Sequence, residues 1–153
     1  MKTYRTQHNR RQSARYRQGV LSLELLIVLP ILLIVMCAVV QFTMLLMASQ
    51  TVHAAAAAGA REAALPGATA QTVQHRVQEV VENWRFADSL APVEIYVNDQ
   101  PEYTYPLYEA VPGDVVRVNI TVDALATTPD LLQFIGLSLR NEKLNSTFVM
   151  RKE

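Results

Sequence analysis

An uninterrupted apolar run dominates the first third of the chain. Between residues 25 and 60 there is no Asp, Glu, Lys or Arg, and residues 25–48 are apolar apart from Gln41 and Thr43. About 20 apolar residues in a helix cross the hydrocarbon core of a bilayer. The run is longer than that and apolar on every side, which is unusual for a buried helix of a soluble protein. We therefore predict a transmembrane helix.

The helical pattern continues beyond this run and returns after a break. The alanine-rich residues 54–64 favour an extension of the membrane helix, and Pro66-Gly67 is expected to end it. The small residues of this extension either simply lengthen the helix or form a surface that packs closely on a partner. Apolar residues then recur at helical spacing over residues 70–87, which predicts a second helix with Thr69 or Thr72 as its N-cap.

The rest of the chain alternates between apolar and polar residues in short stretches, as half-buried strands do. We predict three main antiparallel strands, at residues 93–97, 115–122 and 144–151. Residues 103–108 form a candidate edge strand, although Pro106 would interrupt its hydrogen bonds. The predicted fold class is α+β: a long N-terminal transmembrane helix that continues outside the membrane, then a second helix packed on a small antiparallel sheet.

Charge divides the chain into two unlike parts, although its formal net charge is zero. Residues 1–19 contain six basic residues and no acidic one. Residues 20–153 contain eight basic and fourteen acidic residues, a net charge of −6. Basic flanks of a membrane helix stay in the cytoplasm. We therefore expect a single-pass protein of the inner (cytoplasmic) membrane, with a cytoplasmic N-terminus and a periplasmic or extracellular C-terminal domain.

The sequence shows no pattern of catalytic or cofactor chemistry. Cys37 is the single cysteine, so no internal disulfide is expected. The three histidines, His8, His53 and His75, lack a nucleophile or a set of metal ligands at a useful spacing. We therefore expect neither enzyme activity nor a metal or other cofactor. The acidic charge of residues 20–153 also disfavours nucleic acid as a partner.

One acidic residue stands directly before the apolar run. Glu24 lies in the stretch Gly19-Val-Leu-Ser-Leu-Glu, between the basic residues and the run. A carboxylate in hydrocarbon is costly and is therefore a candidate functional group. Taken alone, Glu24 fits equally well a position among lipid headgroups and water, where it would have no special role.

The basic leader, Gly19, Glu24 and the apolar helix together resemble the prepilin peptidase site of type IV pilins and pseudopilins. The resemblance implies cleavage between Gly19 and Val20, which makes Glu24 the fifth residue of the mature chain. Where that family usually has Phe as its first mature residue, this chain has Val20. The new N-terminal amine of one subunit would pair with Glu24 of a neighbour, reducing the cost of desolvating both groups.

The N-terminal region resembles more narrowly the TadE-like proteins, minor pseudopilins of the tight-adherence (Flp pilus) system. The matching features are Glu24, Leu29-Pro30, Gln41-Phe42, Ala60-Arg61-Glu62 and the closing residues 146–151. Many relatives have an acidic residue where this chain has Gln41. Pro30 removes a helical hydrogen bond, so a kink is expected there; it is either an ordinary transmembrane proline or a flexing point for assembly.

This resemblance implies three segments: a cytoplasmic leader (1–19), a transmembrane helix with its extension (20–65) and a periplasmic α+β domain (66–153). It also implies prepilin peptidase, other pilin-like subunits, the inner-membrane pilus assembly platform and membrane lipid as partners. Two other hypotheses remain open. The chain is an unprocessed single-pass anchor that presents a small adaptor or sensor domain, or, least favoured by its residues, a membrane-tethered enzyme.

Overall fold

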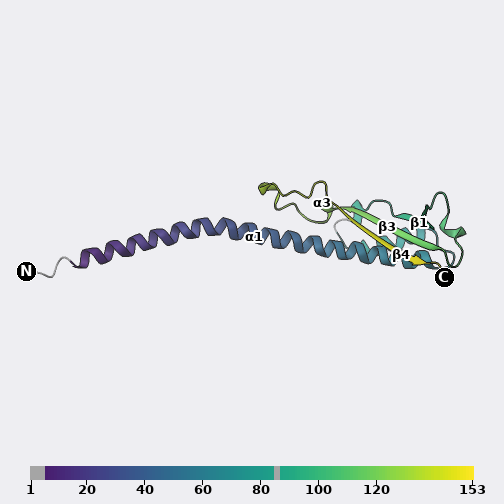
Figure 1. Cartoon of the computed structure of the whole chain (residues 1–153), viewed down its shortest axis with the longest axis horizontal. Coiled ribbons are helices and arrows are strands. Elements are labelled where there is room, and N and C mark those ends of the chain that lie inside the picture. Colours follow the sequence, from purple (N-terminus) through teal and green to yellow (C-terminus); the bar gives the residue numbers. More distant parts are fainter. Residues whose placement is uncertain (1–5, 85–86) are drawn as a thin grey trace, which may run out of the picture. The chain divides into compact units, whose positions relative to one another are not determined.

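A computed structural model describes the backbone of residues 6–84 and 87–153, and the side chains of residues 23–84 and 87–153. Contacts divide the chain into two compact units, residues 1–39 and residues 40–153. The first unit contains the N-terminal part of helix α1 (Thr6–Ala64), and the second contains the rest of α1 and every other element (Figure 1).

The second unit contains one antiparallel sheet. Its strands are β1 (Glu94–Val97), β2 (Gln100–Pro101), β3 (Val115–Asp123) and β4 (Lys143–Arg151), in the order β2-β1-β3-β4. Helix α2 (Ala70–Val81) precedes the sheet in the sequence, and the short helix α3 (Ala124–Thr127) follows β3. Three single-turn helices lie in the connections: η1 (Ala87–Ser89), η2 (Leu107–Glu109) and η3 (Gln133–Ile135). This architecture confirms the predicted α+β class.

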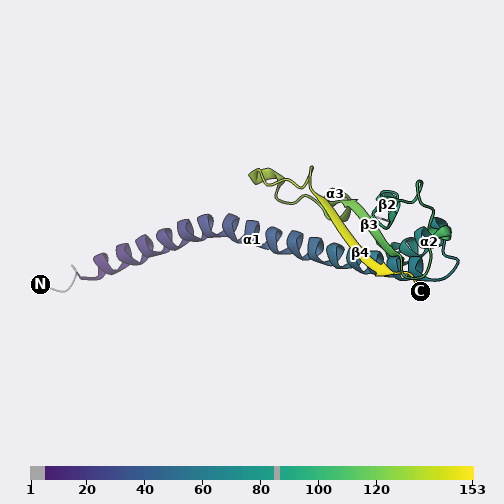
Figure 2. The ribbon, with the colours of Figure 1, turned by 45° about the vertical axis from the view of Figure 1, so that its right-hand side comes forward.

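The core of this unit lies between one face of the sheet and the two helices. Alternate residues of β3, from Val116 to Val122, are buried and the residues between them are not, as expected for a strand with one covered face. Val118 at the centre pairs with Ile95 on β1 and with Phe148 on β4. Figure 2 shows β3 and β4 running alongside the C-terminal part of α1.

Helix α1 contributes a face of small residues to this core. Its fully buried positions recur every three or four residues and are almost all alanine: Ala48, Val52, Ala55, Ala56, Ala60 and Ala63. Small side chains let the helix approach its neighbours closely. A Cβ at Gly59 would lie 2.7 Å from Val77 Cγ2 on α2 and 3.4 Å from Val118 Cγ1 on β3. Within the chain, the alanine-rich extension is therefore a packing surface for α2 and the sheet.

Helix α2 is shorter than predicted. It begins after Thr69, whose side chain accepts a hydrogen bond from Thr72 N while the Thr72 hydroxyl accepts one from Thr69 N. It ends at Val81 instead of residue 87. Asn83 is a weak helix former, and the chain turns there so that Trp84 packs against the core. The buried valines of α2 confirm its predicted apolar face.

The predicted edge strand at residues 103–108 is wrong. Residues 102–104 form a turn, and Pro106 precedes the single helical turn η2. Pro106 has no N–H to donate to a neighbouring strand, and its backbone is suited to the start of a helical turn. The fourth strand is instead β2, which forms a hairpin with β1. Asn98 and Asp99 both have positive φ angles in this two-residue turn, as a type I′ hairpin requires.

We predict that Gly59→Ala destabilises the chain. Alanine is the better helix former, but its Cβ would collide with Val77, which has little rotamer freedom in a helix. The expected net loss is about 1–2 kcal/mol, measured by thermal unfolding of the full chain in detergent micelles. Ala54→Ser, at an exposed position of the same helix, is the neutral control.

The double variant Gly59→Ala/Val77→Ala tests the cause of this loss. Val77→Ala alone leaves a cavity and is also destabilising. If the collision is responsible, the two losses combine to less than their sum, because the new methyl group fills part of the space. Strictly additive losses would contradict the packing explanation.

Candidate functional site

The residues expected to carry processing and assembly lie in the N-terminal part of α1. Gly19 and Val20 fall within the helix, and their side chains lie outside the described residues. Glu24 is exposed, and it has no hydrogen-bond or ion-pair partner among residues 23–84 and 87–153. Pro30 lies inside α1. Among the described residues the carboxylate of Glu24 is therefore unpaired.

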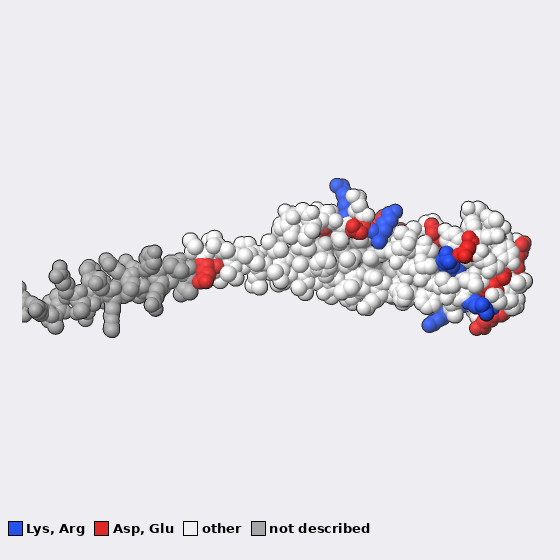
Figure 3. All heavy atoms as spheres, viewed as in Figure 1, with Lys and Arg blue, Asp and Glu red and all other residues white. Residues whose placement is uncertain are grey.

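The helix that follows Glu24 presents apolar side chains all round. Of the described residues, one stretch, Leu23–Ala64, is long and apolar enough to cross a membrane, and none of its most apolar window is buried in the chain. Leu26, for example, is 72% exposed. In Figure 3 a long stretch of the described surface of this helix carries no charged side chain. So large an exposed apolar surface requires lipid or other apolar helices to cover it.

Gln41 interrupts the apolar run and is used inside the chain. The residue is only 4% exposed, and its Oε1 accepts a 3.0 Å hydrogen bond from the backbone N–H of Leu132. This contact ties α1 to the connection between α3 and β4. No sequence pattern indicates it, because the two residues are 91 positions apart and a backbone donor has no signature of its own.

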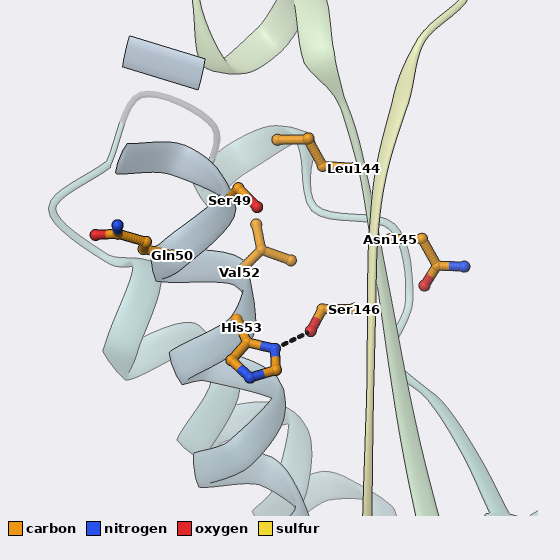
Figure 4. A pocket seen from close by; sticks show the side chains of 7 residues that line it. All are labelled: Ser49, Gln50, Val52, His53, Leu144, Asn145 and Ser146. Atoms are coloured by element: carbon orange, nitrogen blue, oxygen red, sulfur yellow. Dashed lines mark hydrogen bonds between the residues drawn. The ribbon is translucent and has the colours of Figure 1, made fainter. Parts of the chain in front are cut away.

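A second polar contact joins α1 to β4. His53 Nδ1 lies 2.9 Å from Ser146 Oγ, and the imidazole ring packs edge-on against Phe148, with ring centroids 5.7 Å apart. The pair borders a cleft of about 270 Å³ between the helix and the strand (Figure 4). Sequence analysis missed this pair because the two residues are 93 positions apart.

The His53–Ser146 pair combines a hydroxyl nucleophile with a histidine base. A carboxylate that orients the histidine is not found beside the pair among the described residues. The cleft beside the pair is lined by Ser49, Gln50, Val52, Leu144 and Asn145. Hydrolysis by such a pair also needs an oriented imidazole and a site that stabilises an oxyanion. The contact is better explained as a tie between α1 and the sheet.

One segment of α1 matches a known protein family. Residues 19–61 match the TadE-like protein family. The TadE-like segment, as we call these residues, includes Gly19, Glu24, Pro30 and Gln41, and the match confirms the resemblance inferred from the sequence. Proteins of that family are associated with the Tad pilus and are structural. No curated protein and no solved structure shows significant similarity to the chain.

The TadE-like segment ends just before a cap on the C-terminal end of α1. The ammonium group of Lys152, a residue only 6% exposed, donates hydrogen bonds to the carbonyl oxygens of Ala63 and Leu65, at 3.3 Å and 3.1 Å. The backbone N–H of Glu153 donates to Ala64 O. The last carbonyls of a helix have no partner within it, and a cation there also interacts favourably with the helix dipole. The residues after β4 thus hold the end of α1.

Asp114 connects this cap to two turns. Its Oδ1 accepts a 2.9 Å hydrogen bond from Asn98 Nδ2, and its Oδ2 accepts one of 2.9 Å from Val111 N and one of 3.3 Å from the Tyr105 hydroxyl. Its backbone carbonyl accepts a hydrogen bond from Lys152 N. The carboxylate therefore orders the hairpin turn of β1 and β2 and the turn before β3 at once.

These contacts shift the pKa values of three groups. Hydrogen bonds from Asn98 first, and then from Val111, lower the pKa of Asp114, while its partial loss of solvent opposes them. Loss of solvent, followed by the nearby charge of Asp114, raises the pKa of Tyr105. Burial lowers the pKa of Lys152, and the charge of Asp114 acts in the opposite direction.

We predict that protonation of the Asp114 carboxylate destabilises the second unit in acid. Its folded-state pKa is depressed below the usual value of an aspartate, about 3.9. The charged carboxylate therefore stabilises the fold at neutral pH, and this contribution disappears as the pH falls from about 4 through the folded-state pKa. Asp114→Asn should melt at a lower temperature than the wild type at pH 7. The difference should shrink in acid, and a constant difference would contradict the assignment.

Proposed function

We propose that this chain is a minor pseudopilin subunit of a Flp/Tad-type pilus assembly and secretion system. Prepilin peptidase removes residues 1–19 by cutting between Gly19 and Val20, and the mature chain assembles through its N-terminal helix. One observation supports the proposal most directly. Within the TadE-like segment, Glu24 directly precedes the uncharged residues 25–60 of the helix, and it is exposed and has no partner among the described residues.

The charge of Glu24 explains why cleavage and assembly would be coupled. Cleavage creates an amine at Val20, four residues before the carboxylate. An acidic side chain in the centre of a bilayer costs about 3 kcal/mol on insertion scales, and a new ammonium near the same boundary is also poorly solvated. Pairing the amine of one subunit with Glu24 of the next reduces both costs. An uncleaved chain has no amine at this depth to offer.

The orientation follows from the charges that flank the helix. The six basic residues of the leader stay in the cytoplasm, so α1 crosses the inner membrane outward and the sheet lies in the periplasm or outside the cell. In this arrangement lipid first covers the apolar surface of α1. The inner-membrane pilus assembly platform and other pilin-like subunits replace lipid during assembly. The chain then acts as a structural subunit and not as an enzyme.

Replacing Gly19 tests the cleavage. A bulky side chain at this position should block entry of the backbone into the protease, since glycine presents none. In a host with an active prepilin peptidase, we expect the wild type to begin at Val20 and Gly19→Phe to retain the leader, as measured by intact mass of membrane-extracted protein. Gly19→Ala, which adds one methyl group, is the matched control and should still be cut.

The same measurement separates the proposal from its main alternative. A wild-type chain that keeps Met1 in that host would show an unprocessed single-pass anchor and overturn the proposal. A Gly19→Phe chain of mature size would show that the cut lies elsewhere.

Replacing Glu24 tests the assembly step separately. Glu24→Gln keeps the shape and removes the charge, so cleavage should persist while the amine of a neighbour loses its counter-charge. A pairing worth about 1.4 kcal/mol corresponds to a tenfold change in occupancy. We therefore expect the yield of co-purified pilin-like subunits to fall by about that factor, measured per processed chain. Gln50→Glu, an exposed position beyond the apolar run, controls for a simple change of charge. An unchanged yield for Glu24→Gln would contradict the pairing.

A further inference from the structure

The connection between α3 and β4 exposes several large apolar side chains. We call residues 130–139 the apolar loop. Phe134 is 60% exposed and Leu137 is 59% exposed, and Ile135 between them is exposed as well. Phe134 and Ile135 belong to η3, and Leu137 follows it. The chain has no charged residue between Asp130 and Arg140. An apolar tip of this kind is unusual in a connection that faces water.

The apolar loop is fastened to the part of α1 that belongs to the apolar run. The hydrogen bond from Leu132 N to Gln41 Oε1 is buried. Beside it, a cavity of about 210 Å³ is lined mainly by apolar side chains of Phe42 and Leu45 from α1 and of Leu132, Leu137 and Leu139 from the loop. Figures 1 and 2 both show the loop extending from the sheet along α1.

The position of Gln41 in the sequence sets the depth of this contact. If the hydrocarbon core begins at Leu25, directly after Glu24, about 20 helical residues cross its roughly 30 Å. The helix then leaves the hydrocarbon near residue 44. Gln41, Phe42 and Leu45 lie around this boundary, and the loop that is fastened to them lies at the same level, on the side where the sheet lies.

The backbone of the apolar loop is suited to a poorly hydrated environment. The carboxylate of Asp130 accepts hydrogen bonds from the Ser138 hydroxyl, at 2.7 Å, and from Leu139 N, at 3.2 Å, which closes the loop on itself. Inside the loop, the N–H groups of Ile135 and Leu137 donate to Leu132 O. Groups that are bonded internally lose little when water leaves. The loop thus turns apolar side chains outward and much of its backbone polarity inward.

We propose that the apolar loop inserts its exposed side chains into the headgroup–acyl boundary of the leaflet through which α1 leaves the membrane. The occupant of this surface is lipid, because Phe42, which borders the same cavity as Leu137, is itself exposed within the apolar run. Exposed Arg140 and Lys143 follow the loop, with exposed Glu142 between them, and at this depth the two cationic side chains would be in reach of lipid phosphates. The loop and α1 then form a two-point anchor that fixes the sheet against the membrane surface.

This inference rests on the membrane crossing of α1 that the proposed function requires, and depth measurements on the full chain test the two separately. In a Cys37→Ala background, a nitroxide spin label is attached at Leu33→Cys in the apolar run, at Ile135→Cys or Leu137→Cys in the loop, or at Val149→Cys. Val149 is the matched control, an exposed apolar side chain on β4. The labelled chains are reconstituted in phosphatidylcholine vesicles containing phosphatidylglycerol, and collisions with oxygen and with a water-soluble nickel chelate are compared.

We expect the labels at positions 33, 135 and 137 to collide more often with oxygen than with the nickel chelate. The label at position 149 should collide more often with the nickel chelate. Nickel access at both loop positions, with position 33 in lipid, would overturn the loop insertion and leave the proposed function intact. Nickel access at position 33 would overturn both. Shielding of the loop labels from both reagents would show that protein covers the loop, and would overturn lipid as its occupant. Two loop positions are used so that one poorly folded variant, detected by circular dichroism, does not decide the result.

Discussion

Helix α1 is one continuous element with two different surroundings: lipid or other helices along its apolar run, and α2 and the sheet along its alanine-rich part. The rest of the structure depends on this change of surroundings. From Leu25 to Met47 its side chains are apolar apart from Gln41 and Thr43, and most of the large apolar ones are exposed in the single chain. From Ala48 onward, buried positions recur every three or four residues and are mostly alanine. The first pattern suits a surrounding of lipid or other helices, and the second suits a helix with one partner face. The change occurs without a break in the helix.

Within the second unit, three polar contacts hold the C-terminal part of α1 to the residues around the sheet. Gln41 binds the backbone of the apolar loop, His53 meets Ser146 on β4, and Lys152 caps the last carbonyls of the helix. The alanine face between them offers close approach but little apolar area, because alanine side chains are small. The three polar contacts, of which those of Gln41 and Lys152 are buried, therefore define the position of the helix more sharply than the alanines alone would.

The residues proposed for processing and assembly are separated from those that stabilise the fold. Gly19, Val20 and Glu24 belong to the first unit, whereas the core, the cap and the Asp114 contacts all belong to the second. Changes in one set therefore leave the other largely intact, as expected for sites without shared contacts. The match to the TadE-like family ends at residue 61, just before the end of α1. The sheet and α2 lie beyond the matched residues.

The membrane helix, its end near Pro66-Gly67 and the three main strands were predictable from the sequence because each rests on local patterns: apolar length, helix breakers and alternation. The candidate residues Gly19 and Glu24 were also visible in the sequence, since their interest lies in spacing along one helix. Tertiary structure decided the rest. It ended α2 early so that Trp84 could reach the core, replaced the expected edge strand by β2, and brought His53 to Ser146 and Gln41 to Leu132. These outcomes depend on contacts between residues up to 93 positions apart, and a local sequence pattern does not predict such contacts.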